Sequence, residues 1–246
     1  MTKVFNHDST LGEIVATFPK AGSIFKAHKI DYCCGGDRTL AEATAADDAT
    51  SGALLEEINT EYNSYLKEAQ KEVDWTTAPL SDLVTYVVNT HHAYLQKTLP
   101  ILGELTTKIL RVHGPNHADT LGPLHRNFHL FKMDLEQHMI KEEASLFPLV
   151  IEFEKTGDVD VLARLLSNID ELEAEHTEAG DLLKTMRAIT NDYDVPADAC
   201  GTYSYTFQKL AEVEEDMFRH VHLENNVMFP RLQAIGEHEL VSRSLI

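Results

Sequence analysis

HMIKEEASLFP, residues 138–148, and HVHLENNVMFP, residues 220–230, are two versions of one sequence pattern. Each begins with a histidine, has a glutamate four positions later and ends in a Phe-Pro pair. An aspartate also precedes each histidine by four positions, at Asp134 and Asp216. Packing alone would repeat apolar residues, so an Asp, a His and a Glu repeated on one helical stripe indicate a shared chemical role.

Length and composition indicate a globular protein with one large domain or two smaller ones. The chain has 246 residues, and 43% of them are hydrophobic, which is enough for an ordinary core. It contains no uninterrupted apolar run of about 18 residues, so no membrane span is expected. The first residues, MTKVFNHDST, lack the basic and then apolar pattern of a secretory signal.

Charge and cysteine usage exclude further classes of protein. The 40 acidic and 21 basic residues give a formal net charge of −19, which repels phosphate backbones, so nucleic acid is not an expected partner. Cys33, Cys34 and Cys200 are too few and too unevenly placed for a disulfide framework. Without a secretory signal, this usage predicts a cytoplasmic protein in a reducing compartment.

Helical periodicity dominates the chain and predicts an all-α fold. Before a break in composition near Trp75 and Pro79, we expect a small helical domain over residues 1–74, then a linker over 75–80. Gly35 and Gly36 make a helix unlikely in the turn DYCCGGD, residues 31–37. The helices expected in this domain span residues 9–17, 19–28, 38–46 and 51–70.

Four long amphipathic segments follow and predict an antiparallel up-down four-helix bundle over residues 81–246. Ser81 is the expected N-cap of the first segment, which ends at Gly114-Pro115. Pro148 and Pro230 are expected to kink or end the second and fourth segments at matching heights, and Pro100 to kink the first. The segments span about 81–112, 119–154, 158–191 and 198–234.

Each long segment carries a histidine on its apolar stripe, near the middle of the helix. His138, His176 and His220 take these positions in the second, third and fourth segments. The first segment has two adjacent candidates, His91 and His92. Counting helical turns forward from Val84 and Val88 favours His91, whereas counting back from Leu99 and Leu95 favours His92. The other bundle histidines, His222 among them, are expected on the surface or at helix ends.

Glu142 and Glu224 share a face with His138 and His220, because residues four apart on a helix are neighbours. Burying carboxylates and imidazoles in an apolar core is costly unless each group is compensated. A multivalent cation removes this cost, and a carboxylate can bridge two cations. Four histidines and two glutamates therefore predict two metal ions, each with two nitrogens and two bridging oxygens. Nitrogen and oxygen ligands suit iron or manganese, and also zinc.

Three acidic residues are candidates for supporting roles around this centre. Ligating histidines usually donate their second N–H to a carboxylate or carbonyl. Asp134 and Asp216 lie one turn from His138 and His220, and are expected to accept such bonds or to line an access path. Glu175, next to His176, is the third candidate.

The Cys33–Cys34 pair lies in a turn that is rich in glycine, which favours an accessible, reactive or metal-handling dithiol over a buried pair. Adjacent cysteines are strained as an intrachain disulfide. A tetrahedral thiolate site needs four ligands, and only two are local, so it would require a homodimer.

The DYCCGG turn, the two repeated segments and EAEHTEAG, residues 173–180, together resemble the di-iron iron–sulfur-cluster repair proteins, also called repair-of-iron-centres proteins. That family joins a small dicysteine domain to a hemerythrin-like domain, and the resemblance covers nearly the whole chain. It places the family's dicysteine at Cys33 and Cys34. In the first helix, the family's histidine precedes a Leu-Pro pair by seven residues, which selects His92. The iron ligands implied are His92, His138, Glu142, His176, His220 and Glu224.

The resemblance implies two non-haem iron ions per chain with an oxo or hydroxo bridge. It also implies repair of iron–sulfur proteins damaged by oxidative or nitrosative stress, through iron donation or through binding and reduction of nitric oxide. With two nitrogens, two carboxylate oxygens and the oxo or hydroxo bridge, each iron would be five-coordinate and keep one position open. That open position favours an alternative, a module that binds or senses dioxygen or nitric oxide without turnover. A ferritin-like oxidase fits less well, since the helices carry His-x3-Glu instead of Glu-x-x-His.

Overall fold

The computed structural model describes residues 5–44, 48–68 and 73–244, and the regular structure within these ranges is helical apart from an isolated β-bridge between Thr10 and Thr39. The predicted all-α class is thereby confirmed. The chain forms two compact units, residues 84–217, and residues 1–83 together with 218–246. Among the helices described, none is both long enough and apolar enough to cross a membrane.

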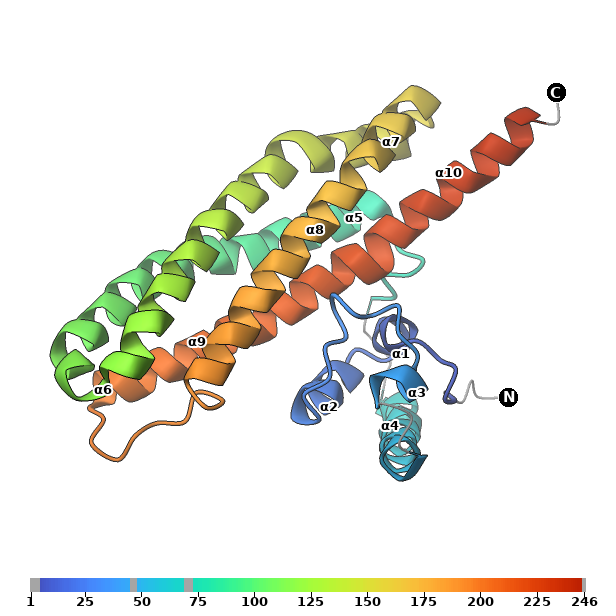
Figure 1. Cartoon of the computed structure of the whole chain (residues 1–246). Helices are drawn as coiled ribbons and strands as arrows, with labels where there is room; N and C mark the ends of the chain where they lie inside the picture. Colours follow the sequence, from blue (N-terminus) through green and yellow to red (C-terminus); the bar gives the residue numbers. More distant parts are fainter. Residues whose placement is uncertain (1–4, 45–47, 69–72, 245–246) are drawn as a thin grey trace. The chain divides into compact units, whose positions relative to one another are not determined.

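The unit of residues 84–217 has the bundle architecture that the sequence predicts. Figure 1 shows α6, drawn in green, turning back on itself, so that its two halves provide two neighbouring helices. The second half packs against α8. The elements that contribute to this unit are α5 (Leu80–Val87), the π-helical turn η1 (Val88–His92), α6 (Ala93–Lys141), the π-helical turn η2 (Glu142–Leu146), α7 (Phe147–Thr156), α8 (Val159–Ile189) and the first part of α9 (Gly201–Leu223).

The reversal in α6 occurs at His117, the residue of this element with non-helical backbone angles, φ −132° and ψ 34°. The sequence predicts an earlier end, at Gly114-Pro115. The helix instead continues past Pro115 to the non-helical residue His117. Ser81 also differs from its predicted role, since α5 already begins at Leu80.

The sequence predicts that Pro148 and Pro230 kink or end their helices, and the structure shows a local change of helix type at both positions without an end. Each follows a five-residue π turn, η2 before Pro148 and η3 (Glu224–Met228) before Pro230. In η2 the N–H of Phe147 bonds to the carbonyl of Glu142, and the equivalent bond in η3 joins the residues at positions 229 and 224. The wider turn accommodates the proline, which has no N–H to donate, and helical structure continues after it in α7 and α10. The repeated Phe-Pro pair therefore marks two matching π turns.

Helix ends in the bundle are fixed by ordinary capping. Gly157 ends α7 in the left-handed conformation with φ 64°, which glycine adopts without steric cost. Asp158 then caps α8 by accepting a hydrogen bond from the backbone N–H of Asp160. The interior is apolar and aromatic, with Phe131, Leu165 and Phe207 almost fully buried.

The other unit contains the N-terminal helices together with the end of the last bundle helix. Thr10 and Glu13 form a capping box that starts α1, and Thr39 and Glu42 do the same for α3. The predicted helix ends at 45–46 and 69–70 and the first residues of the break at 71–72 lie outside the described residues. The helices are α1 (Leu11–Thr17), α2 (Ala21–Ala27), α3 (Leu40–Ala43), α4 (Asp48–Glu68), the end of α9, η3 and α10 (Phe229–Ser244).

Asn226 anchors the glycine-rich turn of residues 31–37 within this unit. Its side-chain amide donates to the carbonyl oxygens of Cys33, at 2.9 Å, and Tyr32, at 3.3 Å. A Cβ atom on Gly36 would lie 2.1 Å from the Asn226 Oδ1 atom, and one on Gly12 would lie 2.8 Å from it. The turn, through Gly36, and α1, through Gly12, can approach Asn226 of η3 this closely only because both positions are glycine.

Candidate metal centre

Five of the six predicted ligands lie in or just before the π turns, and His176 lies within α8. His92 is the last residue of η1, and Glu142 and Glu224 are the first residues of η2 and η3. His138 and His220 lie in the helical turns that precede those glutamates. A π turn adds one residue to a helical turn, so each of these helices changes its register where it presents a candidate ligand.

Glu142 connects two of the histidines. Its Oε2 atom lies 3.4 Å from His92 Nε2, and its Oε1 atom lies 3.2 Å from His138 Nε2. One carboxylate therefore directs an oxygen toward each of two imidazole rings, which come from different helices. This is the arrangement expected of a carboxylate that bridges two cations.

His138 and His176 approach each other directly, with 2.8 Å between their Nε2 atoms. Two nitrogens bound to one cation at about 2.0–2.1 Å and at right angles would lie about 2.9 Å apart. The observed separation therefore fits a shared ion. In the absence of an ion, a proton on one ring can occupy the same gap.

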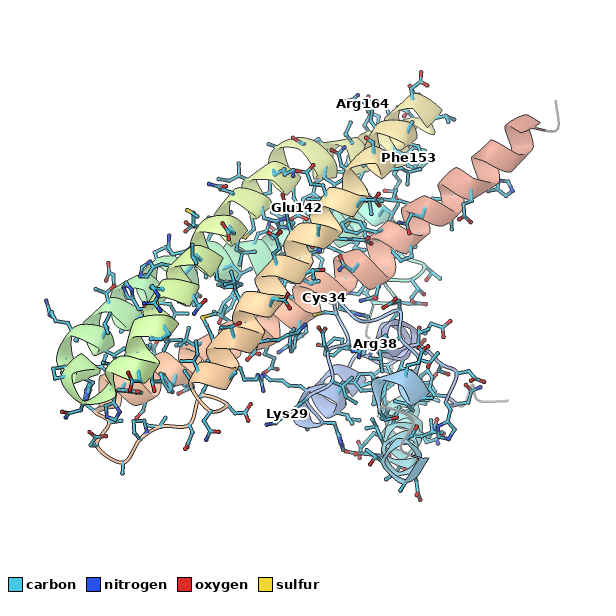
Figure 2. The ribbon with its side chains drawn as sticks, viewed as in Figure 1. Lys29, Cys34, Arg38, Glu142, Phe153 and Arg164 are labelled. Atoms are coloured by element: carbon cyan, nitrogen blue, oxygen red, sulfur yellow. The ribbon has the colours of Figure 1, made fainter. Side chains whose placement is uncertain are left out.

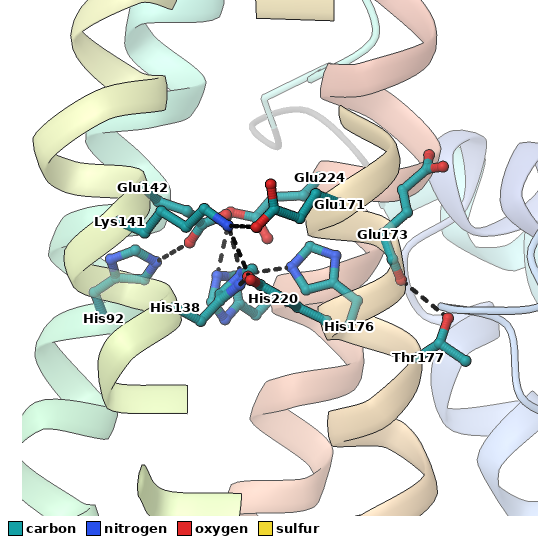
Figure 3. Close-up of polar contacts among 11 residues, drawn as sticks. His92, His138, Lys141, Glu142, Glu171, Glu173, His176, Thr177, His220 and Glu224 are labelled. Atoms are coloured by element: carbon teal, nitrogen blue, oxygen red, sulfur yellow. Dashed lines mark hydrogen bonds and ion pairs between the residues drawn. The ribbon is translucent and has the colours of Figure 1, made fainter. Parts of the chain in front are cut away.

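The fourth helix contributes His220 and Glu224, whose Nε2 and Oε1 atoms are 3.3 Å apart. The candidate ligands form two groups of four residues. Within each group, the four ligand atoms, one from each residue, all lie within 4.8 Å of one another. Figure 3 shows the rings and carboxylates directed toward one another. One group is His92, Glu142, His220 and Glu224, and the other is His138, Glu142, His176 and Glu224.

These groups are deeply buried. Glu142, Glu224, His92 and His220 have 0% exposure, and His176 and His138 have 2% and 5%. Carboxylates in such surroundings are stable only when their charge is compensated. The imidazoles can act as neutral ligands, so cations would supply the compensating charge.

His138 has a supporting carboxylate. Its Nδ1 atom lies 2.6 Å from Glu175 Oε2, and Lys141 Nζ lies 2.9 Å from Glu175 Oε1. Partial burial raises the pKa of Glu175, but the hydrogen bonds from His138 and Lys141 outweigh it and hold the pKa below its ordinary value. The ionised Glu175 can only accept, so His138 carries a proton on Nδ1 and presents the Nε2 lone pair to the cluster.

His92 has an equivalent partner that the sequence analysis missed. Its Nδ1 atom lies 2.8 Å from Glu143 Oε1, and Gln96 donates to the same oxygen at 3.2 Å. Glu143 could not be recognised from the sequence, because it resembles any exposed acidic residue of a helix. The contact directs the His92 Nε2 lone pair toward Glu142 in the same way.

The other predicted residues lie elsewhere around the cluster. His91 is outside both groups, and its Nδ1 atom contacts Asp216 at 2.9 Å, so Asp216 meets His91 instead of His220. Asp134 lines a cavity of about 350 Å³ together with His138, His176 and Glu175. This position fits the predicted access path. Glu175, the third candidate, contacts His138.

His222 corrects the expectation of a surface histidine. It is 4% exposed, and its ring packs edge-on against Tyr32, with 5.8 Å between ring centroids. Burial lowers the pKa of His222 to about 4, so the ring is neutral at physiological pH. Periodicity within one helix could not reveal this, because the covering residue comes from the N-terminal turn.

Cys33 and Cys34 form no disulfide, and their sulfur atoms are 3.8 Å apart. Cys33 is buried, and Cys34 is half-buried, which leaves one thiol partly accessible. Asp31 Oδ1 lies 3.2 Å from Cys33 Sγ. The sequence analysis identified the cysteines but not the carboxylate beside them.

The chain matches two protein-family models. Residues 83–232 match the hemerythrin HHE cation binding domain, and residues 7–62 match a domain of unknown function, DUF542. The imidazoles and carboxylates of the cluster are the donor types that a cation-binding domain of this kind requires.

Relatives of known name match almost the full chain. The iron-sulfur cluster repair protein YtfE of Citrobacter koseri is 34% identical over 227 residues, which cover 92% of this chain and 97% of that protein. The protein of the same name from Escherichia coli O157:H7 is 35% identical with the same coverage. The chain therefore belongs to the iron–sulfur cluster repair family and contains a hemerythrin HHE cation-binding domain.

Proposed function

We propose that this protein restores damaged iron–sulfur clusters and holds two non-haem iron ions in its bundle. The observation that carries the proposal is the overlap between the two groups of ligand atoms. Glu142 and Glu224 belong to both groups, whereas each histidine belongs to only one. Two shared carboxylates support two ions bridged by both glutamates, with an oxo or hydroxo bridge as part of the same proposal. The histidine pairs are His92 with His220, and His138 with His176.

Bound iron would supply a redox-active centre, an open position for small gases and a source of metal for a damaged cluster. The chain's own residues prepare this site. Glu143 and Glu175 orient two of the rings by accepting their Nδ1 protons, and the buried glutamates supply negative charge. The relatives' name, iron-sulfur cluster repair protein, supports the assignment of clients, which are proteins whose clusters have been damaged.

A repair assay tests this proposal. A [4Fe–4S] dehydratase is inactivated with nitric oxide and incubated anaerobically with the iron-loaded chain. We expect Glu142→Gln to lower both the iron content and the recovery of dehydratase activity. Glu152→Gln, which changes an exposed glutamate of α7, is the matched control and should behave as the wild type. Recovery at the wild-type rate with Glu142→Gln would contradict a repair role for the cluster.

Binding of small gases without turnover is a second candidate, favoured by the cavity of about 350 Å³ beside His138 and His176. Stopped-flow spectra of the reduced, iron-loaded chain with dioxygen or nitric oxide distinguish binding from consumption. Formation of nitrous oxide would indicate an enzyme that reduces nitric oxide, whereas a reversible spectrum without product would indicate a sensor. The cytoplasmic location, the homodimer and the domain boundaries at 74 and 81 remain predictions.

A further inference from the structure

We propose that Asp31, Cys33 and Cys34 form a second cation site, which binds one thiophilic divalent ion such as ferrous iron. This site differs in chemistry from the bundle cluster, because two of its ligands are sulfur atoms. It goes beyond the repair function proposed above and does not depend on it. Each of the three residues can offer one ligand atom so that all three atoms lie within 4.8 Å of one another.

The distances fit a shared ion. Two thiolates bound at about 2.3 Å with tetrahedral angles lie about 3.8 Å apart, and a thiolate and a carboxylate oxygen lie about 3.6 Å apart. The Cys33 and Cys34 sulfur atoms are 3.8 Å apart, and Asp31 Oδ1 is 3.2 Å from Cys33 Sγ. An ion would therefore require only small side-chain adjustments. A disulfide would instead need the sulfur atoms to approach to about 2.05 Å, in a strained ring between adjacent residues.

The backbone of the turn is held in place from several directions. Asp31 Oδ1 accepts hydrogen bonds from the backbone N–H groups of both cysteines, at 3.1 Å each. Arg38 donates to the Asp31 carbonyl oxygen at 2.9 Å, and Asn226 donates to the Cys33 carbonyl oxygen at 2.9 Å. Figure 2 labels Cys34 and Arg38 in this part of the chain. The ligands are thus arranged in advance, which lowers the cost of ordering them around an ion.

The charges of the three ligands and the exposure of Cys34 suit an ion that can enter and leave the site. Cys33 is 2% exposed, whereas Cys34 is half-buried and offers an approach. The hydrogen bond that the Cys33 thiol donates to Cys34 Sγ, together with burial and the negative charges nearby, raises the pKa of the Cys33 thiol well above its ordinary value. Binding would release one proton from each thiol, and the divalent ion would then balance two of the three negative charges. Three protein ligands leave a fourth tetrahedral position open for a client or a solvent molecule.

The two types of site can be told apart by their spectra. Cobalt(II) bound to thiolate gives sulfur-to-metal charge-transfer absorption in the near ultraviolet, whereas the imidazole and carboxylate ligands of the bundle contain no sulfur. The probe is therefore Co²⁺, added anaerobically to the full-length, chelator-treated, reduced chain. A Cys200→Ser background removes the third thiol, so that any thiolate band must come from Cys33 or Cys34.

We expect the charge-transfer band to reach its maximum when one Co²⁺ ion is bound at the turn. Added Fe²⁺ should displace this ion and reduce the band. Cys33→Ser and Cys34→Ser should each reduce the band. Asp31→Asn keeps an oxygen that can accept both backbone N–H groups but loses the charge, and should weaken binding by at least about tenfold. Asp37→Asn, at an exposed position of the same turn, is the matched control and should change nothing.

The absence of a thiolate band in the Cys200→Ser protein would overturn the proposal. Equal affinity in Asp31→Asn and the parent would overturn the role of Asp31 as a ligand. Circular dichroism of each variant verifies that the helices are retained. The titration uses Co²⁺ alone and no damaged protein. A failure of the repair assay would therefore not change the result expected from the titration.

Discussion

The Nε2 atoms of His138 and His176 face each other at 2.8 Å in the interior of the protein. Since Glu175 accepts the Nδ1 proton of His138, the lone pair of His138 Nε2 is directed at the neighbouring ring. A proton or a cation must occupy the gap. The two buried glutamates that share this region favour a cation, because a proton alone leaves their charges uncompensated.

Glu175 is expected to strengthen iron binding without being a ligand. Glu175→Ala removes the acceptor that orients His138, and we expect the affinity for iron to fall by about 10- to 100-fold. Competition with a coloured chelator measures this affinity. Glu173→Ala, on the same helix, is the control. Equal affinities in the two variants would show that Glu175 does not orient the ring.

Gly36 is expected to be required for the contact between the dicysteine turn and Asn226. In Gly36→Ala, the added Cβ would meet Asn226 Oδ1 at 2.1 Å and the Tyr32 carbonyl oxygen at 2.7 Å. Overpacking of this kind costs roughly 1–3 kcal/mol. In a background that lacks Cys34 and Cys200, we therefore expect alkylation of the buried Cys33 to accelerate by about tenfold.

Gly52→Ala provides the comparison for that experiment, since nothing lies within 4 Å of the added Cβ. An alanine within α4 should stabilise the helix by about 0.5–1 kcal/mol and leave the alkylation rate unchanged. If Gly36→Ala gave the same rate as Gly52→Ala, the close approach to Asn226 would not protect the thiol.

Cys200 should titrate near neutral pH. The hydrogen bond with His113, at 3.2 Å, is the main cause that lowers the pKa of this thiol to about 7. A lowered thiol pKa places the rise in thiolate at lower pH, so alkylation should accelerate between about pH 6 and 8 and then level off. His113→Ala should move the midpoint upward, toward the ordinary value of about 8.5.

His117→Ala is the control for the Cys200 titration, because His117 contacts Asp198 at 3.0 Å instead of the thiol. The measurement is the alkylation rate at Cys200, followed by mass spectrometry across the pH range. A midpoint that does not move in His113→Ala, or that moves equally in both variants, would contradict the assigned cause.

Arg187 and Glu214 should form a structurally important ion pair. The guanidinium donates through Nε and Nη2 to the two carboxylate oxygens, at 2.8 and 2.7 Å, and Glu214 is 0% exposed. Glu214→Ala leaves the partly buried guanidinium of Arg187 with only the longer contact to Asp192, so it should lower the free energy of unfolding by about 1–3 kcal/mol. Urea denaturation of the metal-free chain measures this change.

The neighbouring pair of Lys209 and Glu212 serves as the comparison, since it is more exposed. Glu212→Ala should cost less than about 1 kcal/mol. A similar loss of stability in Glu212→Ala and Glu214→Ala would show that burial does not set the strength of these pairs.

The helices and the candidate ligands could be predicted because both follow from short-range periodicity. The conflict between His91 and His92 has a physical cause in η1, which spans Val88–His92. A π turn shifts the helical register by one residue, so counting from its two sides gives two different answers. The structure places His92 in a ligand group and His91 against Asp216. The disagreement in the count was itself a signal of the π turn.

Other features could not be predicted because they depend on contacts between distant segments. Asn226 and Tyr32 are 194 positions apart, and the periodicity of either segment contains no information about the other. The burial of His222 by Tyr32 has the same origin. Asp216 shares a stripe with His220, but its partner is decided by the helix that packs opposite.

Metal analysis of the anaerobically purified chain, combined with its absorption spectrum, tests the central claim most directly. We predict two iron ions per chain with oxo-to-iron charge-transfer bands in the oxidised form. Glu224→Gln should reduce the iron content and these bands, since Glu224 belongs to both ligand groups. A native protein that contains only zinc or no metal, or an iron content unchanged by Glu224→Gln, would contradict the account.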